Sequence, residues 1–181
     1  MNTQIEITQN GTTTLATAGK YCDRNIDVNV EVVSGGGADV EAQKAITESL
    51  VNRTITEYSS DTLTEIGVNA FYYCQSLHTL NCPNVLRITR YGLGYTAIQK
   101  LDFSRLQSIY DYAFDNSNLD TLIIRWQGIC TLKGTTAFNN TPIKNGTGFI
   151  YVPDNIVEKY KTATNWATFA NQIKPISKLE E

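Results

Sequence analysis

The sequence predicts an α/β solenoid, a stack of similar coils around one shared core, with helical caps and a small β module before it. The first observation is that residues 66–82 (IGVNAFYYCQSLHTLNC) and 109–124 (IYDYAFDNSNLDTLII) repeat one apolar skeleton while the residues between drift. The second is the spacing, because units that begin at Ile66, Ile88, Ile109 and Leu132 are 22, 21 and 23 residues apart. The third is composition: with 41% hydrophobic and 18% charged residues, the 181-residue chain can bury a sizeable core.

Each unit carries the same columns of apolar residues. The columns are Phe71, Leu93, Phe114 and Phe138; Leu77, Ile98, Leu119 and Ile143; Leu80, Leu101 and Leu122; and Cys82, Phe103 and Ile124. The last two columns are two residues apart, which indicates a short strand, and the spacing before them suits a turn or short helical segment that returns the chain. One coil cannot bury these side chains alone, so stacked coils must bury them against each other.

This pattern is typical of a leucine-rich-repeat array. The stretch IGVNAFYYCQSLHTLNCP further resembles the BspA-like leucine-rich repeat, whose pattern is I-G-x-x-A-F-x-x-C-x-x-L-x-x-L-x-x-P. The resemblance covers residues 63–153, although the second unit has Gly92-Leu93 where Ala-Phe is expected. Outside phages it implies a role as a bacterial cell-surface adhesin.

Both ends of such an array need covering, because an open end exposes core columns and unpaired strand edges. Residues 39–62 are expected to form an N-terminal helix and cap, and residues 154–181 a C-terminal helical cap. In the C-terminal cap we expect Asp154 to N-cap a helix from Asn155 to about Lys161. A second helix from Asn165, stopped by Pro175, should place three apolar residues on one face: Trp166, Phe169 and Ile173.

Residues 1–33 read as a separate small β module, joined to the array by a glycine-rich linker at 34–38. Asn10-Gly11 between IEIT and TTTL predicts a hairpin, and residues 26–32 alternate as a half-buried strand should. A module this small usually needs a partner or an oligomer, so we expect a homo-oligomer.

The N-terminal segment GTTTLATAGKYCDRNIDVNVEV, with its glycine linker, is similar to segments in structural proteins of tailed bacteriophages and prophages of Firmicutes. The resemblance implies a virion protein made in the host bacterial cytoplasm: a tail fibre, baseplate or head-decoration component that adheres to the host surface. Its implied partners are other virion proteins, through the N-terminal module, and a host surface protein or glycan. The alternatives are a bacterial cell-surface adhesin and an intracellular protein-interaction module.

Several function classes are disfavoured by the residues themselves. The net charge of −3 and the absence of a basic run argue against nucleic acid as a partner, and no apolar run is long enough to span a membrane. The N-terminus also lacks the basic and apolar regions of a signal peptide. We expect no catalytic residue, cofactor or metal site: the single histidine, His78, has no motif around it, and Asp111 and Asp115 are expected to be solvated. The four cysteines are expected to be buried free thiols, with a disulfide or a metal site as the alternative.

Two surfaces are candidates for partner binding. The predicted outward strand positions are His78, Thr79, Asn81, Gln99, Lys100, Asp102, Asp120, Thr121, Ile123 and Arg125. The second candidate is a set of tyrosines, because tyrosine offers a broad contact area with little lost entropy. Its members are Tyr72, Tyr73, Tyr91, Tyr95, Tyr110 and Tyr112, of which Tyr73, Tyr95 and Tyr112 are the chosen site candidates. The alternatives are a plain solvated face for the strand positions and packing between coils for the tyrosines.

Overall fold

The computed structural model describes residues 3–9, 12–18, 30–32 and 55–179, and the first three of these segments form a sheet of their own. Strands β1 (Thr3–Gln9), β2 (Thr12–Ala18) and β3 (Val30–Val32) are antiparallel in the order β1-β2-β3. Gln9 pairs with Thr12, which confirms the predicted hairpin. The expected linker at 34–38 and the expected helix from residue 39 lie outside the described residues.

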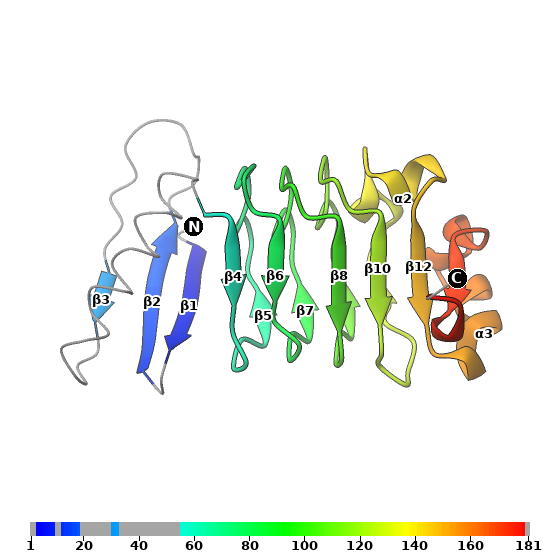
Figure 1. The fold of residues 1–181 in the computed structure, drawn as a ribbon, viewed down its shortest axis with the longest axis horizontal. Helices are drawn as coiled ribbons and strands as arrows, with labels where there is room; N and C mark the ends of the chain where they lie inside the picture. The colour runs from blue at the N-terminus through cyan, green and yellow to red at the C-terminus, as the bar shows by residue number, and fades with distance from the viewer. Residues whose placement is uncertain (1–2, 10–11, 19–29, 33–54, 180–181) are drawn as a thin grey trace.

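The rest of the described chain coils so that its long strands lie side by side along the molecule (Figure 1). These strands are β4 (Glu57–Ser59), β6 (Thr79–Asn81), β8 (Lys100–Phe103), β10 (Thr121–Ile124), β12 (Phe149–Val152) and β13 (Ile173–Pro175). All of their pairings are parallel: β4 pairs with β6, and β8, β10, β12 and β13 form one sheet in sequence order. The stack therefore begins at β4, inside the stretch expected to be an N-terminal cap.

A second parallel sheet backs the first and is made of two-residue strands. Its members, in spatial order, are β5 (Glu65–Ile66), β7 (Arg87–Ile88), β9 (Ser108–Ile109) and β11 (Thr131–Leu132). The second residue of each strand is the residue that opens a repeat unit, and its side chain is buried in the core. Among the described residues helices are few and confined to 135–178, so the returning segments of the repeats are strands and turns, and the expected α/β character holds only near the C-terminus.

The third side of each coil is a turn in which non-glycine residues adopt left-handed backbone conformations. Their φ angles lie between 55° and 65°, and they are Asn69, Tyr73, Tyr91, Tyr95, Tyr112, Asn116 and Asn140. Successive turns are hydrogen-bonded to each other: Phe71 N–H donates to Gly92 O, and Phe114 N–H donates to Ala137 O. Backbone hydrogen bonds consequently join neighbouring coils on all three sides.

The predicted apolar columns fill the interior. Every member of the columns through Phe71, Leu77 and Leu80 is buried. Each fully buried aliphatic or aromatic side chain stabilises the fold by roughly 1.5–3 kcal/mol, before the entropy of ordering it is subtracted. Some residues between the columns, among them Val85 and Leu106, are buried as well, and the drift is tolerated at the positions that remain exposed.

The segment after β12 differs from the expected pair of helices. A 3₁₀ turn at Asp154–Ile156 (η2) precedes helix α3 (Val157–Thr162), and Asp154 does not cap it. The Asp154 carboxylate instead accepts from Ser177 N–H at 3.2 Å. Hydrogen bonding from the side chain of Ser177, and then from its backbone, lowers the pKa of this carboxyl. Trp166 and Phe169 are buried in a 3₁₀ helix (η3, Trp166–Phe169), but Ile173 lies in β13, where Pro175 ends the strand.

This C-terminal segment closes the free edge of β11 with side chains. The Tyr160 hydroxyl accepts from Cys130 N–H at 2.9 Å, and Trp166 Nε1 donates to Cys130 O at 2.6 Å. Asn165 Nδ2 donates to Leu132 O at 2.8 Å. Backbone groups that would otherwise be offered to another strand are thus satisfied within the chain.

Two further short helices lie between β11 and β12. They are the 3₁₀ helix η1 (Thr135–Phe138) and α2 (Pro142–Asn145). Thr141 caps α2, since its hydroxyl accepts from Lys144 N–H at 3.2 Å. These residues lengthen the last coil, so its strand β12 begins later than the unit spacing predicts.

Candidate functional site

The solvent-facing side of strands β6, β8, β10 and β12, which we call the strand face, carries most of the predicted site residues. Thr79, Asn81, Lys100 and Asp102 are exposed on β6 and β8, with buried Leu80 and Leu101 between them. The register aligns the rows across the sheet: Lys100 pairs with Thr121, and Thr121 with Phe149. The structure therefore brings these residues together in one surface, as predicted.

An ion pair on this face joins two predicted residues. Arg125 donates from Nε to Asp102 Oδ1 at 2.8 Å and from its terminal nitrogen to Asp102 Oδ2 at 2.7 Å. This two-pronged geometry holds both side chains across neighbouring coils and raises the pKa of the guanidinium. Because both groups are largely exposed, the pair fixes the shape of the surface more than it stabilises the fold.

Ile123 was expected to be exposed on this face, and that expectation is wrong. Alternation on β10 places it on the outer side, between the inward Leu122 and Ile124, yet its side chain is 0% exposed. Laterally it pairs with Asp102 and Tyr151. At β10 the surrounding residues of the strand face therefore cover the Ile123 side chain completely, although it lies outside the central core.

Sequence reasoning missed the aromatic residues at the C-terminal half of the strand face. Phe149 on β12 is 37% exposed, and its ring lies 6.4 Å from that of Tyr151. Lys174 Nζ lies 5.6 Å from the Phe149 ring centroid, within cation–π range. The signal that could have found them is the alternation in FIYV at 149–152, which was hidden because the last coil is longer than the others.

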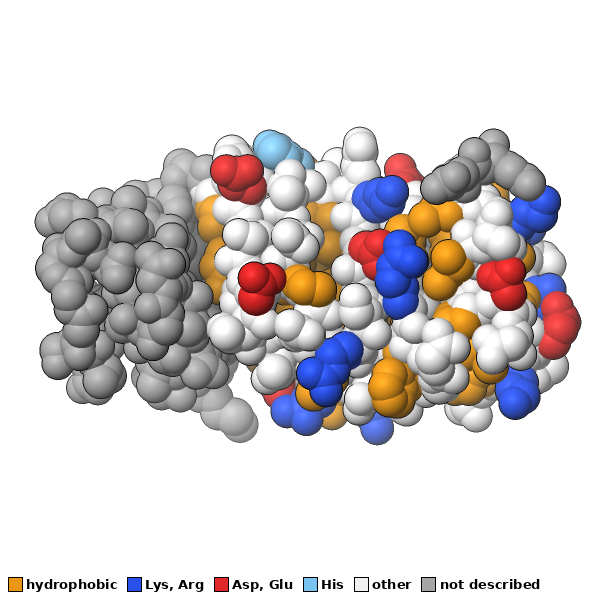
Figure 2. Space-filling model, turned by 60° about the horizontal axis from the view of Figure 1, so that its bottom comes forward, with side chains coloured by type: hydrophobic (Ala, Val, Ile, Leu, Met, Phe, Trp, Pro, Cys, Tyr) orange, Lys and Arg blue, Asp and Glu red, His pale blue; other side chains and the backbone are white. Residues whose placement is uncertain are grey.

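The remaining predicted strand-side residues are His78, Gln99 and Asp120, which precede β6, β8 and β10. His78 is exposed, and its Nδ1 lies 3.0 Å from Thr79 Oγ1. Gln99 is exposed and Asp120 half-buried. Figure 2 shows Lys, Arg, Asp and Glu side chains interspersed over the described part of the face it presents, with hydrophobic side chains between them.

The predicted tyrosines form a contact cluster on the turn side. We call Tyr72, Tyr73, Tyr91, Tyr95 and Tyr112 the tyrosine cluster; all five are half-buried. The rings of Tyr73 and Tyr95 stack with centroids 4.2 Å apart, and those of Tyr91 and Tyr112 at 5.1 Å. The cluster thus combines both alternatives, since its members pack between coils and also reach solvent.

Packing inside this cluster changes its acid–base behaviour. Burial, and then charge on neighbouring tyrosines, raises the pKa of Tyr72 from 10.0 to about 12. The Arg90 guanidinium lies 5.1 Å from the Tyr112 ring centroid and 5.3 Å from that of Tyr91. Room for the Tyr72 ring comes from Gly94, where a Cβ atom would lie 3.1 Å from Tyr72 Cδ2. That contact gives a physical reason for a glycine at position 94.

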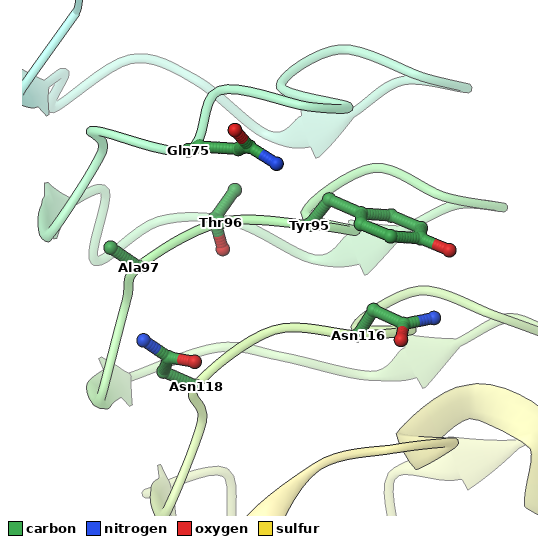
Figure 3. Close-up of a pocket in the computed structure, with 6 residues that line it drawn as sticks. All are labelled: Gln75, Tyr95, Thr96, Ala97, Asn116 and Asn118. Atoms are coloured by element: carbon green, nitrogen blue, oxygen red, sulfur yellow. The ribbon is translucent and has the colours of Figure 1, made fainter.

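A small pocket lies beside the cluster, where the turns lead into the strands (Figure 3). Its volume is about 210 Å³, and its lining comes from three successive coils: Gln75, Tyr95, Thr96, Ala97, Asn116 and Asn118. Asp115, next to Asn116, was expected to be solvated but is buried, and its carboxylate accepts from Asn116 Nδ2 at 2.9 Å. Asp111 likewise accepts from the Thr136 hydroxyl at 2.7 Å.

The described residues show no feature that would hold a metal. Cys74, Cys82 and Cys130 are buried and form no disulfide in the described part of the chain, as predicted, and burial raises the pKa of Cys82 to about 12. Cys22 lies outside the described residues. In the described part of the chain, no three His, Cys, Asp or Glu side chains are grouped so that they could hold a metal ion. Within the same residues, no helix is long and apolar enough to cross a membrane.

The fold and its surfaces define a repeat protein with a solenoid-like architecture, of a class that serves in protein interaction or adhesion. Residues 48–163, well over half of the chain, match the BspA type leucine-rich repeat region. The chain belongs to this family, and the match extends beyond the expected limits of 63–153 at both ends. No curated protein matches the sequence.

Proposed function

We propose that this protein is a non-enzymatic adhesion module that binds a molecule of a bacterial cell surface through its strand face. The observation that carries the proposal is the grouping of Arg125, which follows β10, with Phe149 and Tyr151 on the outer side of the paired strand β12. Tyrosine and arginine are among the side chains that most often dominate binding energy at protein interfaces. Their grouping on one side of a rigid sheet suits a recognition surface.

The way this face is built supports binding without a conformational change. Parallel pairing fixes β10 between β8 and β12, and the Asp102–Arg125 ion pair spans two neighbouring coils. A surface already ordered before contact loses little entropy on binding. The face also carries both signs of charge, from Lys100, Asp102 and Arg125, which favours a mixed polar and aromatic partner over a polyanion.

We further propose that the molecule is displayed on a phage particle, as a tail-fibre, baseplate or head-decoration protein. This part of the proposal is supported by the N-terminal segment, whose residues 11–32 are similar to segments of phage structural proteins. In this arrangement the β1–β3 sheet would join the chain to other virion proteins, as a homo-oligomer, and the repeats would face the host.

The adhesive role is tested by measuring how fluorescently labelled full-length chain binds to intact Firmicutes cells. We expect Phe149→Ala and Tyr151→Ala each to weaken binding by roughly thirtyfold, the equivalent of about 2 kcal/mol. Tyr110→Ala is the matched control, because Tyr110 is 36% exposed but follows β9 on the opposite sheet. Equal binding by all three variants would place the contact elsewhere on the molecule.

The virion location is tested separately, with an antibody against residues 63–153 applied to purified particles under the electron microscope. Label on fibres or at the tail tip supports host adhesion, and label over the head supports a decoration role. Unlabelled particles combined with binding of the chain to cells would favour a cell-surface adhesin. Unlabelled particles without cell binding would favour an intracellular interaction module.

A further inference from the structure

We propose that the pocket lined by Gln75, Tyr95, Ala97 and Asn118 is a subsite for a neutral saccharide unit. This inference rests on the proposed adhesive function and names the class of surface molecule that the repeats would recognise. It places the contact on the turn side, apart from the aromatic residues of the strand face.

The size of the pocket limits its occupant. At about 210 Å³ it is smaller than the roughly 300–1,000 Å³ of sites that enclose drug-sized ligands. It can admit one ring of a larger chain, with the remainder in solvent. Its lining residues come from three neighbouring coils and lie one above another (Figure 3), so the chain of a glycan could continue along the stack.

The polar groups of the pocket are suited to hydroxyls and not to ions. Three of the six lining side chains are primary amides, and none is charged. A primary amide both donates and accepts hydrogen bonds, as a sugar hydroxyl does. An anionic ligand would find no cation among the lining residues, and a cationic ligand would find no carboxylate.

Two of these amides are available for a ligand. Within the described part of the chain, the side chains of Gln75 and Asn118 make no hydrogen bond, whereas Asn116 Nδ2 is already donated to Asp115. The Thr96 hydroxyl is also committed, because it donates to Leu93 O at 3.0 Å. The expected contacts therefore come from Gln75 and Asn118, with Asn116 Oδ1 as a further acceptor.

The space between the amides exists because of Ala97. In the repeat this residue directly precedes the buried Ile98, and the equivalent positions before Leu77 and Leu119 are Ser76 and Asn118. Tyr95 forms a fixed wall beside it, since its ring stacks on Tyr73 at an interplanar angle of 7° and its N–H donates to Asp115 O at 2.9 Å. A pocket with one small side chain and one immobilised ring is ready for a ligand without rearrangement.

The test is an NMR titration of the ¹⁵N-labelled full-length chain with neutral monosaccharides at millimolar concentrations: glucose, galactose, rhamnose and N-acetylglucosamine. We expect at least one sugar to shift the side-chain amide signals of Gln75 and Asn118. Gln75→Ala and Asn118→Ala should each weaken the affinity about fivefold to tenfold, because each removes hydrogen bonds to the sugar. Ala97→Gln should abolish the shifts at the remaining amides by filling the pocket.

Gln107→Ala is the matched control, since Gln107 is an exposed amide away from the pocket, and it should leave the titration unchanged. Absence of shifts with all four sugars, or shifts that persist in Ala97→Gln, overturns the inference. Failure here is separable from failure of the adhesive role. If Ala97→Gln leaves cell binding unaffected, the adhesive function is retained and only the role of the pocket is contradicted. If the protein binds a sugar but does not bind cells, the adhesive function is contradicted.

Discussion

Ser117 lies three residues after Phe114, at a buried position of the repeat. The same position carries a thiol or a hydroxyl in the other units: Cys74, Thr96 and Thr141. Thr96 and Thr141 each donate to the carbonyl three residues earlier, at 3.0 and 2.7 Å. The Ser117 hydroxyl is 3% exposed and has no hydrogen-bond partner among the described residues. A buried hydroxyl without a partner costs about 1–3 kcal/mol.

This difference predicts opposite outcomes for two similar substitutions. Ser117→Ala should leave the free energy of unfolding unchanged or raise it by about 1 kcal/mol, because it removes an unsatisfied group. Thr141→Ala should lower it by about 1–2 kcal/mol, since the Thr141 hydroxyl bonds Phe138 O and also caps α2. Urea unfolding measures both, and a similar loss in the two variants would contradict the assignment.

The raised pKa of Tyr72 predicts how stability depends on alkaline pH. Its folded pKa of about 12 lies above the ordinary 10.0 of an unfolded chain, so the folded state retains the proton longer. The associated stability is complete below about pH 10 and is lost as the pH rises through about 12. Tyr72→Phe should therefore reduce the fall in stability between about pH 9 and about pH 11.

Urea unfolding at the two pH values measures this effect, with Tyr110→Phe as the matched control outside the cluster. A tyrosine-selective ¹³C NMR titration gives an independent readout, in which the Tyr72 signal should move late. An unchanged alkaline dependence in Tyr72→Phe would show that the cluster does not hold this proton.

Among the elements, the turns hold asparagine and tyrosine residues in a left-handed backbone conformation. Asn140 has a φ of 55° and is exposed, so little packing compensates for the strain there. Asn140→Ala should destabilise the protein by about 1 kcal/mol, because alanine lacks the local hydrogen bonding that lets asparagine adopt this conformation. Asn140→Gly should be close to neutral.

Chemical denaturation of the two Asn140 variants provides the check. Ala167, in contrast, is an exposed residue of η3 without a positive φ, so Ala167→Gly serves as a control for the general effect of glycine. If Asn140→Ala were as stable as Asn140→Gly, backbone strain would not limit these turns.

The element that closes β11 is expected to be sensitive to loss of a single atom. Tyr160→Phe removes the acceptor of Cys130 N–H in a buried environment and should cost about 1–3 kcal/mol. Tyr151→Phe is a suitable control, because Tyr151 is half-buried on the outer side of β12. Hydrogen exchange should show faster exchange at Cys130 in Tyr160→Phe only.

How far the sequence predicts these elements depends on whether a feature repeats. The columns through Phe71 and Leu77 could be predicted because three sides of every coil bury the same positions. The burial of Ile123 could not, since it depends on side chains of neighbouring strands. The predicted N-cap role of Asp154 was wrong for a similar reason. Its partner, Ser177, is distant in sequence, whereas N-cap rules use only neighbouring residues.

The candidate site was predictable in its polar half and not in its aromatic half. Asp102 and Arg125 lie on regular strand positions, so the unit spacing predicted that they share a face. Phe149 and Tyr151 lie beyond η1 and α2, which lengthen the last coil and break the spacing. The pocket depends on one small residue, Ala97, whose effect appears only when three coils are stacked.

For the whole molecule, the regular pairing of one coil with the next predicts that a complete coil can be removed. Ile88 and Ile109 occupy equivalent positions on β7 and β9 and are 21 residues apart. Deletion of residues 88–108 should therefore leave a folded, less stable protein, because every remaining column stays in register.

Deletion of residues 88–107 is the control, since it is one residue shorter and displaces β9 by one position. That shift turns core side chains to the wrong face, so this variant should lose its cooperative thermal transition by circular dichroism. If both deletions behaved alike, stability would not depend on the register of the stack.

The closed edge at β11 also has a consequence for how such a gene can change in length. Tyr160, Asn165 and Trp166 occupy backbone groups that a new terminal coil would need on the β11 side, so an extension added after the last repeat could not continue the sheet that ends at β11. Interior coils of nearly equal length, in contrast, can be copied or lost by recombination between their own coding sequences. Longer and shorter descendants should consequently differ by whole units in the middle of the array, while the closing segment remains the same.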